Sequence, residues 1–271
     1  LFALVGIPLI WGIKSIGRIV AFLVPAMALF YIVGGLVIVC MKASVVPQAF
    51  AMIFKHAFTP QAATGGFLGS TVMMAIQMGI SRGIFSSEAG LGSSPIAAAA
   101  AKTDSPGRQA LVSMSSVFIT TVIVCTITGL VIATTGVLGE VGPDGQLLNG
   151  SALALRAFDA VLPGGGLIVT IALIPFAYST ILGWAYYGEK CVEYLFGEKG
   201  VPYYRVLAAL LVIPGAVLNL QLIWKVADIM NGLMAFPNLV GLFFLAKIVS
   251  SETRLFENLV KSERKAAKKK A

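Results

Sequence analysis

The sequence predicts an all-α protein that crosses a lipid bilayer several times, and two features of its composition lead to this fold class. Hydrophobic residues make up 58% of the 271 residues and charged residues only 12%, whereas a soluble domain is typically about a quarter charged. Six apolar stretches reach or approach the roughly 20 residues that a helix needs to cross the hydrocarbon core. A single soluble core cannot bury that many, so we expect a polytopic membrane protein.

The spans follow one another along the chain, and turns rich in glycine and proline separate most of them. The chain begins at Leu1 inside an apolar run that lacks the charged start and the small-residue cleavage site of a signal peptide. We therefore expect it to start within a span, with an N-terminal portion missing. The predicted spans are Leu1–Ile13, Ile16–Val39, Gly65–Ala101, Leu111–Thr134, Leu167–Tyr187, Tyr203–Leu218 and Trp224–Ile248.

The lysine and arginine residues lie mostly on one side of these spans, which predicts the orientation of the chain. Fifteen of the 20 basic residues fall on that side, and eight of them belong to the segment from Lys247 onward. Because cytoplasmic loops carry the excess of basic residues, we expect a protein of the cell membrane with a basic cytoplasmic tail at 249–271. Lys268–Lys270 either touches anionic lipid headgroups or belongs to a solvated, frayed tail.

Two segments on the extracytoplasmic side carry apolar residues at helical spacing. These are Pro47–Phe58, within an extracytoplasmic loop at 42–64, and Leu147–Leu162. Both can form short amphipathic helices over the mouth of a helix bundle. An ordered loop is an equally open interpretation of each.

The distribution of reactive residues argues against enzyme chemistry. Cys40, Cys125 and Cys191 lie far apart in or beside apolar runs, and His56 is the single histidine. The spans contain no serine beside a histidine or lysine base, no paired aspartates and no metal cluster. We therefore expect no enzyme, no cofactor and no transition-metal site. A channel is also less expected, since it favours a continuous polar stripe over one interrupted span.

Glycine and charge interrupt the span at Gly65–Ala101. Arg82 and Glu88 lie at a depth where an ionisable group costs roughly several kcal/mol unless it faces protein or water. Non-helical backbone is likewise tolerated there only around a cavity. We expect the helix to break at Gly79–Gly83 and to restart at Ile84, with Arg82 and Glu88 paired across the break as a structural latch.

A broken helix offers two kinds of unsatisfied backbone group. Carbonyl oxygens at the end of the first half can hold a cation, and N–H groups at the start of the second half can hold a carboxylate. Glycine also lets the backbone approach a small ligand closely. The alternative is that the glycines serve only close helix packing, although packing alone does not explain Arg82 together with Glu88.

Three segments of the sequence match a known pattern. Gly83–Ala100 is the longest of them, Asp104–Gln109 follows it, and Ala177–Lys190 forms part of a later span. Together they resemble the alanine or glycine:cation symporter family, whose members are sodium-coupled carriers for small neutral amino acids. The resemblance covers essentially the whole chain up to the charged tail, so we interpret the chain as an N-terminally truncated member.

The resemblance implies an APC/LeuT-type fold, in which two inverted five-helix repeats each begin with a broken span. It implies that 1–41 holds the last two spans of a partial first repeat. It also implies that 65–248 is a complete second repeat with a broken first helix. Because the first repeat's own broken helix also supplies ligand contacts in the family, a fragment that does not transport on its own is one alternative.

The resemblance also implies which residues bind the ligands. Ser179 and Thr180 supply hydroxyl oxygens to sodium, which is a hard cation. Thr180 and Trp184 share one helix face, and Trp184 with Phe85 leaves room only for a side chain of hydrogen or methyl. The alternatives are that Thr180 bonds its own helix and that Trp184 is ordinary packing. The residues expected to contact the amino acid are Gly79, Ser81, Gly83, Phe85, Thr180 and Trp184.

The resemblance therefore predicts sodium-coupled symport of alanine or glycine by alternating access. The expected partners are sodium, the amino acid and the lipid bilayer, with no nucleic acid. Proton coupling or another small amino acid is the alternative within transport. Asp228 and Lys225, near the start of the last span, are either an outer-rim pair or part of a gate.

Overall fold

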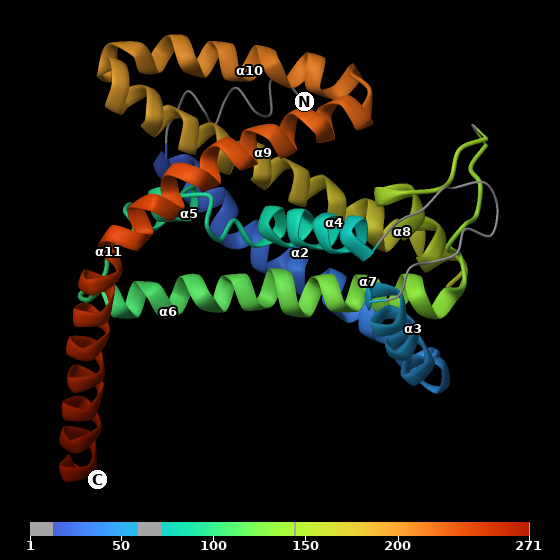
Figure 1. Cartoon of the computed structure of the whole chain (residues 1–271), viewed down its shortest axis with the longest axis horizontal. Coiled ribbons are helices and arrows are strands. Elements are labelled where there is room, and N and C mark those ends of the chain that lie inside the picture. The colour runs from blue at the N-terminus through green and yellow to red at the C-terminus, as the bar shows by residue number, and fades with distance from the viewer. Residues whose placement is uncertain (1–12, 59–71, 144, 271) are drawn as a thin grey trace. The chain divides into compact units, whose positions relative to one another are not determined.

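The computed structural model describes residues 13–58, 72–143 and 145–270, and the regular elements in these ranges are helices (Figure 1). The exception among the described residues is an isolated antiparallel bridge between Val141 and Leu147. The chain forms two compact units. The first unit comprises Leu1–Ile80 and Thr121–Val217, and the second comprises Ser81–Thr120 and Leu218–Ala271.

Five helices within the described ranges are long and apolar enough to cross a membrane. They coincide with five of the predicted spans and confirm the all-α, multi-pass class. The predicted span Leu1–Ile13 lies outside the described residues except for Ile13, and the start of Gly65–Ala101 lies outside them as well. The five are Val20–Met41, Pro106–Thr135, Gly166–Phe196, Glu198–Val217 and Leu220–Lys269.

The first unit is built on three long helices, with shorter helices between them. Its long helices are α2 (Ile13–Met41), α9 (Gly166–Phe196) and α10 (Val201–Val217). The shorter elements are η1 (Ala43–Val45), α3 (Val46–Phe58), α7 (Cys125–Thr135), α8 (Gly150–Asp159) and η3 (Glu198–Gly200).

Close helix packing in the first unit depends on two neighbouring glycines of α2. A Cβ added at Gly35 would lie 2.3 Å from a side-chain carbon of Ile127, and one at Gly34 would lie 2.7 Å from Ile168. Small residues of this kind let the backbones of membrane helices approach each other. The core beside them includes Ile38 and Phe158, both fully buried, so α2 is held against α7, α8 and α9.

The second unit contains the end of α4 (Val72–Ser87), α5 (Ser94–Ala98), α6 (Pro106–Val117) and α11 (Leu220–Lys270). The last of these is a single helix of 51 residues. The segment at 249–270, interpreted above as a basic tail, therefore continues the helix of the last span instead of fraying.

The structure decides one expectation from the sequence and shows one feature that was not expected. The two segments predicted to be extracytoplasmic are helical, as α3 and α8, so the ordered-loop interpretation of Pro47–Phe58 and Leu147–Leu162 is wrong for most of each segment. The span Pro106–Thr135 contains a seven-residue π-helix, η2 (Phe118–Val124), that the sequence analysis did not predict. The organisation into repeats stays a prediction.

Candidate functional site

The interruption of the span lies later in the chain than predicted. Helix α4 continues through Gly79 and Gly83 to Ser87, so the break expected at Gly79–Gly83 is not there. A glycine inside a helix costs only about 1 kcal/mol relative to alanine, which does not suffice to end it. The backbone turns where φ is positive, at Glu88 (53°), Gly90 (87°) and Gly92 (82°).

The turn from Glu88 to Ser93 is held by its own polar groups and by α11. The Ser93 hydroxyl is buried and donates to Oε2 of Glu88 at 2.9 Å. The Asn238 amide nitrogen donates to the Gly90 carbonyl at 2.9 Å. A Cβ at Gly92 would lie 3.0 Å from Oδ1 of the same Asn238 side chain. Glycine is therefore required at this position both by its positive φ and by the neighbouring helix.

Arg82 belongs to a group of polar and aromatic side chains that joins α4 to α11. Its guanidinium donates to Oδ2 of Asp228 at 2.5 Å and lies 4.3 Å from the centre of the Trp224 ring. The structure therefore gives Arg82 a different partner from Glu88, the residue predicted from the sequence, and gives Asp228 a different partner from Lys225. The observed pair therefore joins two residues that lie 146 positions apart in the chain, whereas the predicted latch joined two residues across one helical break.

Two residues predicted to bind substrate also belong to this group. The Ser81 hydroxyl donates to Oδ1 of Asp228 at 3.1 Å. The Phe85 ring meets the Trp224 ring edge-on, with 5.2 Å between their centres. Ser81, Phe85 and Arg82 lie within two turns of α4, so the helix brings all three to the same part of α11. Gly83 lies on α4 between them.

The Arg82–Asp228 pair is incompletely satisfied. Its side chains are 38% and 34% exposed, and Nη1 of Arg82 is buried without a hydrogen-bond partner among the described residues. A buried donor without a partner typically costs about 1–3 kcal/mol. The Arg82 guanidinium therefore keeps a hydrogen-bond donor without a partner at a place where the sequence predicts a ligand.

The remaining predicted residues lie in the first unit. Gly79 belongs to its part of α4, and Ser179, Thr180 and Trp184 belong to α9. Both hydroxyls donate to the Phe176 carbonyl, Ser179 at 3.0 Å and Thr180 at 2.8 Å. A hydroxyl that donates its proton in this way keeps its oxygen lone pairs for another partner. Helix back-bonding at Thr180 and a role as a cation ligand are therefore compatible.

Trp184 and its surroundings on α9 are aromatic. The Trp184 ring contacts Tyr187 edge-on, with 5.7 Å between the ring centres, and both side chains are partly buried. This packing agrees with the interpretation of Trp184 as interior structure, and it holds the indole in place against Tyr187. The α9 face that carries Thr180 therefore combines a hydroxyl oxygen with a bulky ring one turn away.

An ion pair in the first unit was not predicted from the sequence. Glu189 of α9 is 7% exposed, and both of its carboxylate oxygens accept hydrogen bonds from Arg205 of α10, at 2.8 and 2.9 Å. The signal was present in the sequence, because Glu189 is an acidic residue near the end of an apolar helix. Such a residue needs a cationic partner, and Arg205 follows one loop later.

Comparison with known proteins agrees with the resemblance drawn from Gly83–Ala100. The model of the sodium:alanine symporter family matches residues 1–270. The chain belongs to this family. The "Sodium/alanine symporter AgcS" of Methanococcus maripaludis is 52% identical over 256 residues, which cover 94% of this chain and 55% of that protein. An "Uncharacterized transporter" of Haemophilus influenzae is 49% identical over 251 residues, covering 93% of this chain and 54% of the relative.

A more distant relative carries a different substrate in its name. The "Probable sodium/glutamine symporter GlnT" of Bacillus subtilis is 33% identical over 250 residues, which cover 92% of this chain and 51% of that protein. The chain thus spans about half the length of the curated relatives it matches. Membership of the symporter family and the five apolar helices support a multi-pass membrane protein of the transporter class.

Proposed function

We propose that the protein is a sodium-coupled symporter of a small neutral amino acid, alanine or glycine, that works by alternating access in the cell membrane. The observation that carries this proposal is the interrupted helix pair α4–α5, whose turn at Glu88–Ser93 lies within the segment Gly83–Ala100 that carries the resemblance to the family. Family membership and the name of the 52% identical relative support cation-coupled amino-acid transport. The charge asymmetry of the sequence supports a cytoplasmic C-terminal end.

For the amino acid we propose the six residues that the sequence predicts: Gly79, Ser81, Gly83, Phe85, Thr180 and Trp184. Ser81 and Phe85 are supported by their contacts with the α11 residues Asp228 and Trp224. For sodium we propose Ser179 and Thr180, because their hydroxyl protons are directed to a helix carbonyl and their oxygens can face a cation.

The Arg82–Asp228 pair fits the proposal as a contact that changes during transport. Alternating access requires that helices lining the site separate on one side of the membrane. The pair joins α4 to α11, is about one-third exposed and is incompletely satisfied, so it costs less to open than a buried pair with all its hydrogen bonds. We propose that it closes one entrance to the site, which is the gate interpretation of Asp228 with a different partner.

The sodium site is tested with Thr180→Ala in the protein reconstituted into proteoliposomes. We expect the sodium concentration for half-maximal alanine uptake to rise about tenfold or more, since a ligand to a charged group is lost. Thr135→Ala is the matched control, because Thr135 also bonds its own helix, through the Val131 carbonyl at 2.9 Å, but lies outside the proposed site. An equal effect of both substitutions, or none at Thr180, would remove Thr180 from the site.

The substrate-size proposal is tested with Trp184→Ala. Shortening the side chain should admit amino acids larger than alanine, whereas Trp184→Phe should retain most of the selectivity. Competition of labelled alanine uptake by glycine, alanine, valine and glutamine measures the change. Unchanged selectivity in Trp184→Ala would show that the indole does not limit the pocket.

A further inference from the structure

Helix α11 carries a stripe of basic residues where it leaves the apolar part of the chain. Lys247, Arg254, Lys261 and Lys268 follow one another at intervals of seven residues. Seven residues make almost two full turns of an α-helix, so the four side chains share one face. All four are exposed, and none has an ion-pair partner within the described part of the chain.

The opposite face of α11 packs against the start of α6 in the same unit. Phe256 covers Gly107 so closely that an added Cβ there would lie 2.3 Å from the ring. Glu263, on the same side as Phe256, forms an ion pair with Arg108. Phe256 lies nine residues after Lys247. Nine residues make two and a half helical turns, so the two side chains point to opposite sides of α11. The contacts with α6 therefore orient the basic stripe away from that helix.

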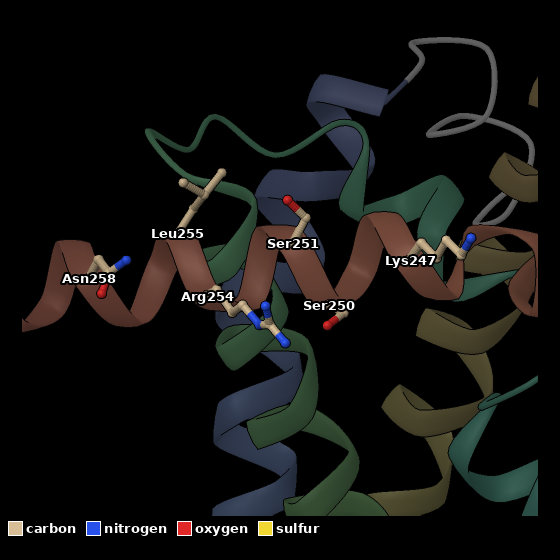
Figure 2. A pocket seen from close by; sticks show the side chains of 6 residues that line it. All are labelled: Lys247, Ser250, Ser251, Arg254, Leu255 and Asn258. Atoms are coloured by element: carbon tan, nitrogen blue, oxygen red, sulfur yellow. The ribbon is translucent and has the colours of Figure 1, made fainter.

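The N-terminal end of the stripe, at Lys247 and Arg254, borders a hollow of about 320 Å³ on the surface of α11. Figure 2 shows Ser250 and Arg254 along one edge of it and Ser251 and Leu255 along the other. Apart from Leu255, the lining offers hydrogen-bond donors: an ammonium, a guanidinium, two hydroxyls and a side-chain amide. No acidic side chain is among the lining residues, which are Lys247, Ser250, Ser251, Arg254, Leu255 and Asn258.

The hollow lies where the apolar run of the last predicted span ends, which is the expected boundary between membrane and water. The apolar run of the last span ends at Val249, and Ser250 and Ser251 follow directly. Long basic side chains at such a boundary extend toward the headgroup region. Because Lys247 and Arg254 carry two uncompensated positive charges there, the chemistry of the site matches an anionic oxygen group, and arginine with hydroxyl donors suits phosphate in particular.

We propose that this hollow binds the headgroup phosphate of an anionic phospholipid in the leaflet next to the C-terminal end of α11. Lys247 and Arg254 neutralise the phosphate, and the Ser250 and Ser251 hydroxyls donate hydrogen bonds to its oxygens. The site is separate from the transport site, so the proposal stands or fails independently of substrate and coupling ion.

The test measures lipid binding to the purified protein by native mass spectrometry in a neutral detergent. Phosphatidylglycerol and phosphatidylcholine with the same acyl chains are added in turn, and the fraction of protein with one bound lipid is counted. We expect phosphatidylglycerol to bind about fivefold more tightly or better, and the double variant Lys247→Gln with Arg254→Gln to lose roughly tenfold or more of that affinity.

The matched control is Lys261→Gln with Lys268→Gln, which removes the same charge from the same face. Lys261 lies about 10 Å beyond Arg254 along the helix, a distance at which salt screens exposed charges, so we expect less than about a twofold change. Circular dichroism checks that each variant keeps its helix content, and the exposed Ser250→Ala with Ser251→Ala variant provides a milder second test, with a smaller loss in the same direction.

Three outcomes would overturn the proposal. Equal binding of phosphatidylcholine, whose phosphate charge is balanced by its choline group, would show that the net negative charge of the lipid is not recognised. An equal loss in the Lys261 and Lys268 control would show diffuse attraction by the stripe instead of a site. Full displacement of the lipid by an equal concentration of inorganic phosphate would show a site for soluble phosphate and not for a phospholipid.

Discussion

Each unit of the molecule contains an ion pair that joins two of its helices, Glu189–Arg205 in the first unit and Arg82–Asp228 in the second, and these two pairs differ in how completely they are satisfied. In the first unit, Glu189 is buried and uses both carboxylate oxygens to accept from two nitrogens of Arg205. In the second unit, Arg82 and Asp228 are each about one-third exposed, and one guanidinium nitrogen of Arg82 is buried without a partner among the described residues.

The difference suggests different tasks for the two contacts. Breaking a buried bidentate pair leaves a charge in a poor environment, which typically costs about 3–5 kcal/mol. Such a contact keeps α9 and α10 together. A pair that is about one-third exposed and leaves one donor unpaired has less to lose on opening than a buried pair with all its hydrogen bonds. We therefore infer that the α9–α10 contact is permanent and that the α4–α11 contact is the one that opens.

The largest expected effect is on stability, from Glu189→Gln. This substitution leaves Arg205 without its carboxylate, so we expect the free energy of unfolding to fall by about 3 kcal/mol. Thermal unfolding of the purified protein in detergent measures the change. A loss below about 1 kcal/mol, as expected for an exposed ion pair, would show that Glu189–Arg205 does not stabilise the protein more than Arg82–Asp228 does.

Asp228→Asn is expected to act on transport more than on stability. Loss of the carboxylate removes the partner of Arg82, so the α4–α11 contact opens more easily and one state of the transport cycle becomes less populated. We expect a change of about tenfold in the rate of alanine uptake, which corresponds to about 1.4 kcal/mol, with a shift in unfolding free energy of less than about 1 kcal/mol. A large loss of stability with normal uptake would make the pair structural.

The second unit also has a contact that we expect to be fixed, at the turn after α4. Gly92→Ala should lower the unfolding free energy by about 1–2 kcal/mol, because alanine is strained at φ +82° and its methyl group would press against Asn238. Gly83→Ala is the matched comparison within α4, where an added Cβ meets no described atom within 4 Å. It should be neutral or stabilise by up to about 1 kcal/mol.

This pair of variants also tests where the helix is interrupted. If Gly83→Ala were the more damaging of the two in thermal unfolding, the interruption would lie at Gly79–Gly83 after all. The measurement concerns stability only, since Gly83 is also a proposed substrate residue.

The smallest effect is expected from Glu140→Gln. Glu140 pairs with Arg156 at 2.7 Å, but these side chains are 38% and 50% exposed. Exposed pairs contribute about 0–1 kcal/mol, so the unfolding midpoint should hardly move. A loss as large as that of Glu189→Gln would show that exposure does not separate the ion pairs of this protein.

The sequence predicted the spans well because length and apolar composition determine them. Five helices coincide with predicted spans, and the segments around Phe54 and Leu153 are helical at their apolar spacing. The position of the interruption was predicted wrongly. The prediction treated Gly79 and Gly83 as helix breakers because of their residue type alone, but α4 continues through both. What ends α4 is a run of positive φ angles at Glu88, Gly90 and Gly92.

The partners of charged residues were harder to predict from the sequence. Asp228 lies 146 residues after Arg82, and nothing in the local pattern favours it over Glu88, which is only one and a half turns away. The expectation that Arg82 pairs with a carboxylate was correct, because an arginine within a predicted membrane span is costly unless it is paired. Which carboxylate it meets depends on how α11 packs, and that information is not local.

The central claim, sodium-coupled transport of a small amino acid, is tested most directly by uptake of labelled alanine into proteoliposomes that contain the protein. An inward sodium gradient at equal pH on both sides should drive accumulation above equilibrium, and replacing sodium with potassium should abolish it. Accumulation driven equally well by a pH gradient in the absence of sodium would contradict sodium coupling. Failure to accumulate either alanine or glycine under any cation gradient would contradict the proposed function itself.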